Sequence, residues 1–206
     1  NIPSEIFNLN HLDFLDLSRN NISGQFPSLI GNLENLEYLN LSNNQLDGEI
    51  PTEIGQLSDL YWLQMDTNQF SGEIPIEIFD LDLYRLYLEN NYLEGEIPIS
   101  IGNLVNLEEI SMGGNNLTGS IPSQIGELVN IHGYISFANN QLSGPIPSEI
   151  GNIVNVSSIY LSDNDFIGTL PVEITNLTSL VHLYLGGNNL SGPIPSEIGN
   201  MENLHY

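Results

Sequence analysis

The sequence contains no cysteine and no lysine, and its only strongly basic residues are Arg19 and Arg85. Without cysteine the chain has no disulfide, no thiol catalysis and no cysteine-ligated metal. The two arginines stand against 26 acidic residues, which gives a formal net charge of −24. A surface of this sign repels nucleic-acid phosphates and anionic lipid headgroups. We therefore predict no nucleic-acid partner, and a basic rather than an acidic one.

Long apolar runs are also lacking. No stretch approaches the roughly 18 consecutive apolar residues of a membrane span, so we predict no direct membrane insertion by this stretch of chain. No signal peptide is recognisable, and the repeat described below is in mid-course at Asn1 and again at Tyr206. We therefore expect a piece of a longer chain that lacks both capping repeats.

What the sequence has instead is one pattern written eight times, L-x-x-L-x-L-x-x-N-x-L-x-G-x-x-P-x-x-I, as in residues 36–54. The asparagine returns after 24, 24, 23, 24, 25, 24 and 24 residues, and a glycine follows four residues after each copy. The recurring asparagines are Asn20, Asn44, Asn68, Asn91, Asn115, Asn140, Asn164 and Asn188. A fixed period of this length indicates a solenoid, in which each repeat forms one coil and needs its neighbours to bury its apolar residues.

The alternation within one repeat predicts a strand with one buried face. Leu39 and Leu41 are two residues apart, so on a strand they point to the same side, which is the core. The intervening Tyr38, Asn40 and Ser42 are then predicted to face solvent. The equivalent residues of all eight coils should form one exposed sheet face.

The polar and turn residues that recur in each repeat have separate roles. The Asn44 amide can both donate and accept, so we expect it to satisfy backbone groups of its own coil and of the next. Stacked over the coils, the eight asparagines are predicted to form an internal ladder. Gly48 allows the chain to bend, and Pro51 suits the outer wall because it has no N–H to leave unpaired. Short 3₁₀ turns are expected after each proline.

The run Leu-Ser-x-Asn-x-Leu-x-Gly-x-Ile-Pro-x-x-Ile-Gly-Asn-Leu, seen in Leu41–Leu57 and Leu185–Met201, resembles the plant-type leucine-rich repeat. The resemblance implies an α/β-type solenoid: a right-handed superhelix with a concave parallel β-sheet, a second and shorter strand on the flank, and 3₁₀ turns. We expect residues 1–206 to form a single domain of about eight full repeats. The subfamily includes ectodomains of plant receptor kinases, polygalacturonase inhibitors and some plant antifreeze proteins.

Two coils depart from the regular length. The fourth is one residue short, and the deletion falls within residues 79–83. The sixth has one extra residue near residues 132–134, where we predict a bulge at the start of the strand.

Aromatic residues of the concave face form the sharpest candidate site. Phe14, Tyr38 and Trp62 occupy one register on three consecutive coils, and exposed aromatics suit peptides or sugar faces. Alternatively, they only stabilise cross-strand packing. We predict a second patch on the later coils, separated from the first by the small, polar fifth coil. The predicted ligand-binding residues are Phe14, Tyr38, Trp62, Gln64, Arg85, Tyr87, Tyr134, Tyr160, His182 and Tyr184.

Other side chains recur without a clear function. Carboxylates share registers on the flank, as in Glu49, Glu73 and Glu96, and we interpret them as a solvated acidic flank, although calcium could relieve their repulsion. The possible glycosylation asparagines are Asn21, Asn40, Asn116, Asn155, Asn176 and Asn189. They carry weight only in a secreted eukaryotic protein, because the repeat itself writes N-x-L-S.

Catalysis has little support in the sequence. The four histidines fall at unrelated registers, and a regular solenoid face offers no deep pocket. We therefore predict no enzyme, no cofactor and no metal. We expect an extracellular or cell-surface module that binds a protein, peptide or polysaccharide on the concave sheet. The alternatives are a structural or adhesin spacer in a long secreted surface protein and, ranked lower, an ice-binding or polygalacturonase-inhibitor-like protein.

Overall fold

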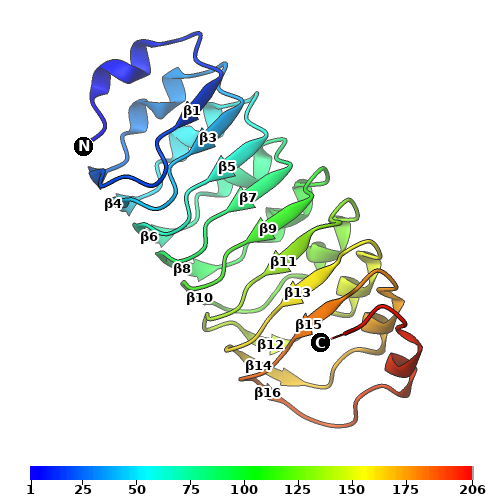
Figure 1. Cartoon of the computed structure of the whole chain (residues 1–206). Coiled ribbons are helices and arrows are strands. Elements are labelled where there is room, and N and C mark those ends of the chain that lie inside the picture. The colour runs from blue at the N-terminus through cyan, green and yellow to red at the C-terminus, as the bar shows by residue number, and fades with distance from the viewer. Residues whose placement is uncertain (206) are drawn as a thin grey trace.

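The computed structural model describes residues 1–205, and these residues form a stack of coils that follow one another along a single axis (Figure 1). Strands on one side of the stack pair in parallel into an eight-stranded sheet in the order β1-β3-β5-β7-β9-β11-β13-β15. These strands are β1 (Phe14–Asp16), β3 (Tyr38–Asn40), β5 (Trp62–Gln64), β7 (Arg85–Tyr87), β9 (Glu109–Ser111), β11 (Tyr134–Ser136), β13 (Ser158–Tyr160) and β15 (His182–Tyr184). We call the outer side of this sheet the concave face.

A second set of strands lies on the flank of the stack and forms sheets of five and three strands. They are β2 (Ser23–Gln25), β4 (Gln45–Glu49), β6 (Gln69–Glu73), β8 (Tyr92–Glu96), β10 (Asn116–Thr118), β12 (Ser143–Pro145), β14 (Asp165–Gly168) and β16 (Asn189–Leu190). The expectation that the flanking strands are the shorter ones is wrong for the second, third, fourth and seventh coils. There they have five residues, or four in the seventh coil, against three in each concave strand.

Each coil is closed by a 3₁₀ turn that begins directly after its proline, as predicted. The turns are η1 (Ser4–Asn8), η2 (Ser28–Asn32), η3 (Thr52–Gln56), η4 (Ile76–Asp80), η5 (Ile99–Asn103), η6 (Ser123–Glu127), η7 (Ser148–Asn152), η8 (Val172–Asn176) and η9 (Ser196–Asn200). Proline fixes the extended entry, with φ −69° and ψ 139° at Pro51. The glycines within the turns let neighbouring turns approach, because a Cβ on Gly126 would lie 2.6 Å from the Glu149 carbonyl oxygen.

The core runs through the whole stack between the two sets of strands and the turns. In the second coil Leu39, Leu41, Leu46, Ile54 and Leu57 are all fully buried. Burial of one such side chain contributes about 1.5–3 kcal/mol. Because both neighbouring coils cover these leucines, the core depends on the stacking of the coils and not on one coil alone.

The length changes of the fourth and sixth coils are absorbed without a shift in the register of the concave strands. Trp62 still pairs with Arg85, so the short fourth coil keeps the strand register. Leu81, which follows its 3₁₀ turn, is extended with ψ 156°, whereas the equivalent Leu57 has ψ 68°. In the sixth coil β11 pairs with β9 only from Ile135 onward, which is the predicted irregularity at the start of the strand.

The ladder asparagines bind the backbone of their own coil and of the preceding one, not of the next one as predicted. Asn115 Oδ1 accepts the N–H of Leu93 at 3.0 Å, and its Nδ2 donates to the carbonyl oxygen of Leu88 at 3.0 Å. The same Nδ2 also donates to Met112 and Gly113 within its own coil. Seven of the eight asparagines repeat this arrangement, from Asn44 to Asn188. Asn20, in the first full coil, donates only to its own coil.

The residue before each ladder asparagine adopts a left-handed conformation, with φ between 55° and 69°. Asn43, Asn90 and Gly114 suit this region, whereas Thr67 is β-branched and has φ 56°. A β-branched residue at positive φ is strained. The strain persists at Thr67 because its N–H donates to the Glu89 carbonyl oxygen of the next coil at 2.8 Å.

Removing a ladder amide should destabilise the stack strongly. Asn115→Ala leaves the buried Leu93 N–H without its acceptor, at a cost of about 1–3 kcal/mol, while the Leu88 carbonyl oxygen keeps only the hydrogen bond from Asn91. Asn116→Ala is the matched control, because Asn116 is the exposed next residue. Urea unfolding followed by circular dichroism measures both variants. Equal midpoints for the two variants would contradict the role of the ladder.

Thr67→Asn should raise stability by about 1 kcal/mol, because asparagine tolerates the left-handed region that threonine resists. The equivalent positions of three other coils already carry asparagine, namely Asn43, Asn90 and Asn139. Thermal unfolding of the variant measures the gain, and Thr52→Asn, outside the left-handed set, serves as the control. A lower melting temperature for Thr67→Asn than for the parent would refute the strain argument.

Candidate functional site

Aromatic rings form an unbroken line of contacts along the concave face, which we call the aromatic line. Seven of the eight coils contribute one ring each, and successive ring centroids lie 4.1–6.2 Å apart. In order, the rings are Phe14, Tyr38, Trp62, Tyr87, Tyr134, Tyr160 and Tyr184. In-register pairing of parallel strands places residues of equal position about 4.8 Å apart, which explains the contacts of Tyr38 with Phe14 and Trp62 and that of Tyr160 with Tyr184. At Tyr87 and Tyr134 the line changes register, because Trp62 pairs with Arg85, and Tyr134 pairs with Ser158.

The expected separation into two patches by the fifth coil is wrong. Tyr87 and Tyr134 come from the fourth and sixth coils, yet their rings stack with centroids 6.2 Å apart and planes inclined by 17°. They meet above Ser111 of the fifth coil, which is completely buried. Because Ser111 has a small side chain, the rings of Tyr87 and Tyr134 from the two neighbouring coils reach each other over it.

In two pairs of neighbouring rings on the line, the ring faces are turned toward each other. Phe14 and Tyr38 lie on adjacent strands, with centroids 4.1 Å apart and planes only 6° apart, so each covers a face of the other. Tyr160 and Tyr184 stack similarly, at 5.1 Å and 13°. The guanidinium of Arg85 covers the Trp62 ring at 4.3 Å. One face of each of these rings is therefore covered by a neighbour and is closed to a ligand.

The predicted site residues differ in how far a ligand can reach them. Phe14 is 56% exposed and Tyr184 41% exposed, whereas Tyr87 is only 9% exposed. Gln64 is half-buried and links the site by accepting from Trp62 Nε1 at 3.4 Å and donating to Asp66 at 2.9 Å. Tyr87 therefore supports its neighbours more than it offers surface.

A shallow hollow of about 340 Å³ beside the line contains two residues that the sequence analysis missed, Tyr61 and Tyr84. Their rings meet edge to face, with centroids 6.3 Å apart, and both are exposed. Arg85 lies between Trp62 and the Glu108 carboxylate, which is 3.8 Å from its guanidinium. The shared register of the two tyrosines, one residue before the strand, was the available signal.

Carboxylates gather beside the middle of the aromatic line. Tyr87 Oη donates to Glu109, and Ser111 Oγ donates to Glu89. Burial, the Glu109 hydrogen bond and its negative charge raise the pKa of Tyr87 far above its usual value. Burial, followed by the charges of Glu89 and Glu109, raises the pKa of Tyr134 to about 12. Both phenols therefore stay neutral near neutral pH and act as hydrogen-bond donors.

Several residues predicted to face solvent are buried. Asn40 and Ser42 are only 8% and 3% exposed, because Asn40 accepts the Ser42 N–H at 3.0 Å and donates to Tyr38 Oη at 3.2 Å. Burial argues against Asn40 as a glycosylation site, which corrects that prediction. The other sequon asparagines, which are Asn21, Asn116, Asn155, Asn176 and Asn189, are exposed.

The histidines do not assemble a catalytic constellation in the described residues. His182 lies on the concave face with its Nδ1 3.1 Å from Ser158 Oγ, and its ring stacks at 6.3 Å on that of Tyr184. His11, His132 and His205 are exposed elsewhere. Among residues 1–205, no group of three or more histidine, aspartate and glutamate side chains is arranged to hold a metal ion.

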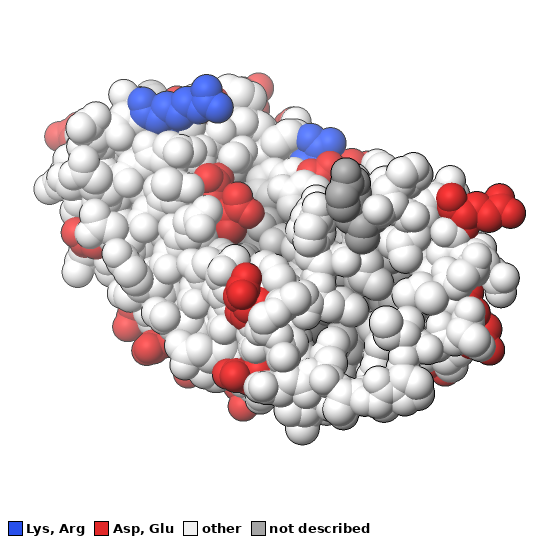
Figure 2. All heavy atoms as spheres, turned by 60° about the horizontal axis from the view of Figure 1, so that its bottom comes forward, with Lys and Arg blue, Asp and Glu red and all other residues white. Residues whose placement is uncertain are grey.

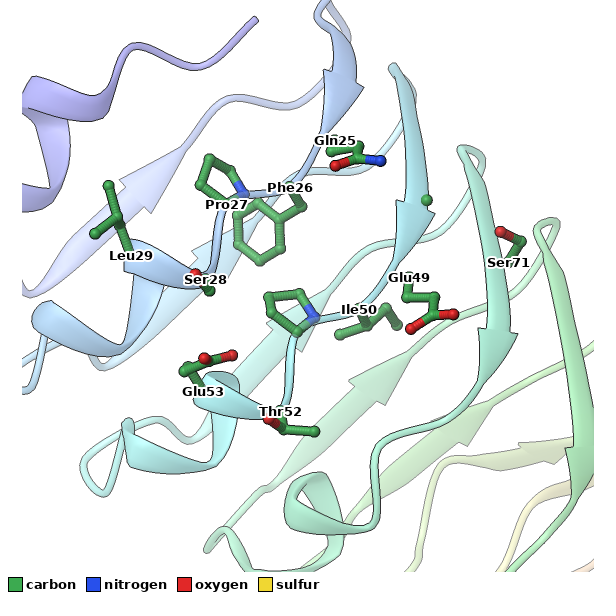
Figure 3. Close-up of a pocket in the computed structure, with 12 residues that line it drawn as sticks. Gln25, Phe26, Pro27, Ser28, Leu29, Glu49, Ile50, Thr52, Glu53 and Ser71 are labelled. Carbon is green, nitrogen blue, oxygen red and sulfur yellow. The ribbon is translucent and has the colours of Figure 1, made fainter.

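A further hollow lies away from the concave face. It has a volume of about 940 Å³ and opens between the flanking strands and the 3₁₀ turns of the first coils. Figure 3 shows Glu49 and Ser71 on the strand side and Glu53 on the turn η3, with the buried Phe26 and Ile50 between the two layers. Its lining is mixed and lacks a convergent group of polar atoms.

The stacked coils, the internal asparagine ladder and the open concave sheet define the chain as a parallel leucine-rich solenoid with an accessible sheet face. The described part of the chain has no helix with the length and apolar character needed to cross a bilayer.

The chain belongs to the leucine-rich repeat family. Family models described as leucine-rich repeat match residues 10–70 and, further along, residues 82–104, 106–128, 134–153, 155–177 and 179–201. A comparison with curated protein sequences gives no match.

Solved structures with the same fold include plant receptors. The Arabidopsis receptor kinase HAESA, in complex with the peptide hormone IDA and the co-receptor SERK1, is 32% identical with a TM-score of 0.90 over 98% of this chain. The ectodomain of the receptor kinase GASSHO1/SCHENGEN3 from Arabidopsis thaliana, in complex with Casparian strip integrity factor 2, is 34% identical with a TM-score of 0.79 over 98%. This chain spans only 35% and 27% of those two chains. A plant ice-binding protein is 27% identical with a TM-score of 0.78, over 95% of this chain and 70% of its own.

The tyrosines at the centre of the site predict a loss of stability at high pH. The pKa of Tyr134 is 10.0 in its ordinary state and about 12 here. Its contribution is therefore fully present below pH 10.0 and is lost as the pH rises to about 12, because the unfolded state releases the proton first. Tyr134→Phe should flatten the fall in urea midpoint across this window, whereas Tyr92→Phe on the exposed flank should not. An equally steep fall in Tyr134→Phe would contradict the assignment.

Proposed function

We propose that this chain is a non-enzymatic recognition module that binds an extended peptide, or an extended segment of a protein, on its concave face. The aromatic line carries the proposal, because it is a continuous, partly exposed contact surface along nearly the whole sheet. Aromatic anchors of this kind dominate binding energy at protein interfaces. The proposed binding residues are those predicted from the sequence, together with Tyr61 and Tyr84.

The orientation of the rings favours a peptide over a polysaccharide. Sugars stack on aromatic faces, but one face of each ring in the two stacked pairs is covered by its neighbour, and one face of Trp62 is covered by Arg85. Ring edges and phenol hydroxyls, by contrast, suit the carbonyl oxygens of an extended backbone. The peptide hormone in the HAESA complex supports the same class of ligand.

The charge of the chain favours a basic ligand. With a formal net charge of −24, the chain attracts cationic partners and repels acidic ones over several ångströms. Figure 2 shows acidic side chains distributed over the displayed face, with few basic atoms among them. Affinity for a basic peptide should therefore fall with added salt.

We further propose an extracellular or cell-surface location, because the similar GASSHO1/SCHENGEN3 structure is described as the ectodomain of a plant membrane receptor kinase. A structural or adhesin spacer remains the second candidate, since a repeat array can also serve only as a rigid connector. Ice binding is disfavoured by the large aromatics on the concave face and by the flanking carboxylates, although one similar structure is an ice-binding protein.

A screen of random linear peptides and of a polysaccharide array would test the proposal directly. We expect the screen to enrich basic peptides, and we expect no binding to the polysaccharides. Tyr38→Ala with Trp62→Ala should weaken the binding of the enriched peptides by at least about tenfold, because this change removes two adjacent, partly exposed rings of the line. Tyr92→Ala is the matched control, since Tyr92 is 58% exposed on the flanking strand β8. Retained affinity in the Tyr38/Trp62 variant would remove the aromatic line as the site, and binding to polysaccharide alone would overturn the ligand class.

A further inference from the structure

The middle of the concave face lies over the fifth coil, and we call the region around Glu89, Glu109 and Tyr134 the saddle. Strand β9 of the fifth coil contributes Glu109 and the buried Ser111, and the following Gly113 is buried as well. It is the one coil of the eight that adds no ring to the aromatic line. The rings of Tyr87 and Tyr134 stack on each other above this coil.

Negative charge in the saddle is not balanced by the protein itself. Glu89 and Glu109 each accept a hydrogen bond from a neutral hydroxyl group, and both are half-buried. The ion pairs found among residues 1–205, from Arg85 and His132, both go to Glu108. Arg85, the arginine on the concave face, is thus already held by Glu108 and Trp62.

We propose that this saddle, the central subsite of Glu89, Glu109 and Tyr134, binds one arginine or lysine side chain of the peptide ligand. The inference rests on the proposed function and states which ligand residue the concave face selects, and where. Two half-buried carboxylates next to an aromatic ring match a cation on a long aliphatic stem, because the stem packs on the ring while the charge meets the carboxylates.

The location follows from geometry and charge together. The flanking carboxylates are exposed to solvent, where an ion pair contributes little. In the saddle both carboxylates are half-buried, so the same charge–charge contact is less screened by water and is stronger. The raised pKa of Tyr134, to which Glu89 and Glu109 contribute, reports the negative potential at this point.

The test compares two charge-matched variants with a defined probe. Acetylated, amidated tetra-arginine is titrated against the protein, with tetra-citrulline as its neutral counterpart, by calorimetry and by the fluorescence of Trp62, the one tryptophan of the chain. The double variant Glu89→Gln with Glu109→Gln should lower the affinity for tetra-arginine by about tenfold, because two charge-assisted contacts are lost. Glutamine keeps the hydrogen bonds from Tyr87 and Ser111, which protects the fold. Glu49→Gln with Glu73→Gln removes the same charge from the flank and should change the affinity by less than about twofold.

The outcomes separate the subsite from the proposed function. Equal weakening in both double variants would overturn the subsite, because the attraction would then be diffuse. Trp62→Ala is measured in parallel: if it weakens tetra-arginine and the saddle variant does not, concave binding stands and the subsite falls. If neither variant has an effect, the probe binds elsewhere and both proposals are overturned. Equal affinity for tetra-citrulline would likewise exclude a cation subsite.

Discussion

The asparagine ladder is the constraint on which the rest of the structure depends. Each solenoid coil buries its turn between two neighbours, where water cannot satisfy the backbone. One amide accepts an N–H and donates to three carbonyl oxygens, as Asn115 does. A single side chain therefore supplies hydrogen-bond partners to four buried backbone groups. Unmade buried hydrogen bonds cost about 1–3 kcal/mol each. The leucines can therefore pack in register only because the asparagines recur in register with them.

A ladder of this kind leaves the concave face free to carry a binding surface. The inward residues of each strand are committed to the core, but the outward residues need only tolerate their neighbours across the sheet. Parallel pairing in register then converts a sequence position into a spatial row. The contact between Phe14 and Tyr38 follows from this rule, and so does the contact between Tyr38 and Trp62. The outward side chains of the concave strands can therefore change without a change in the core.

The regular part of the structure could be predicted from the sequence, and the irregular part could not. Period, strand positions and the turns after proline follow from local chemistry, and the short fourth coil is visible in the spacing. The contact of Tyr87 with Tyr134 needs knowledge of how side chains lean over a small neighbour, which no spacing encodes. The burial of Asn40 depends on hydrogen bonds to Tyr38 and Ser42 that alternation alone does not reveal. The repeat pattern likewise does not encode whether each asparagine binds the preceding coil or the next one.

The alignment of the inter-coil hydrogen bonds has a mechanical consequence. The backbone bonds of the sheet and the ladder bonds of the asparagines join each coil to the next, so both sets run along the solenoid axis. A pulling force along that axis loads successive junctions in series, and the weakest one yields first. Sideways bending instead stretches one wall while it compresses the opposite wall, and the continuous core resists both. The chain should therefore behave as a rod that is stiff in bending and that lengthens, under tension, coil by coil.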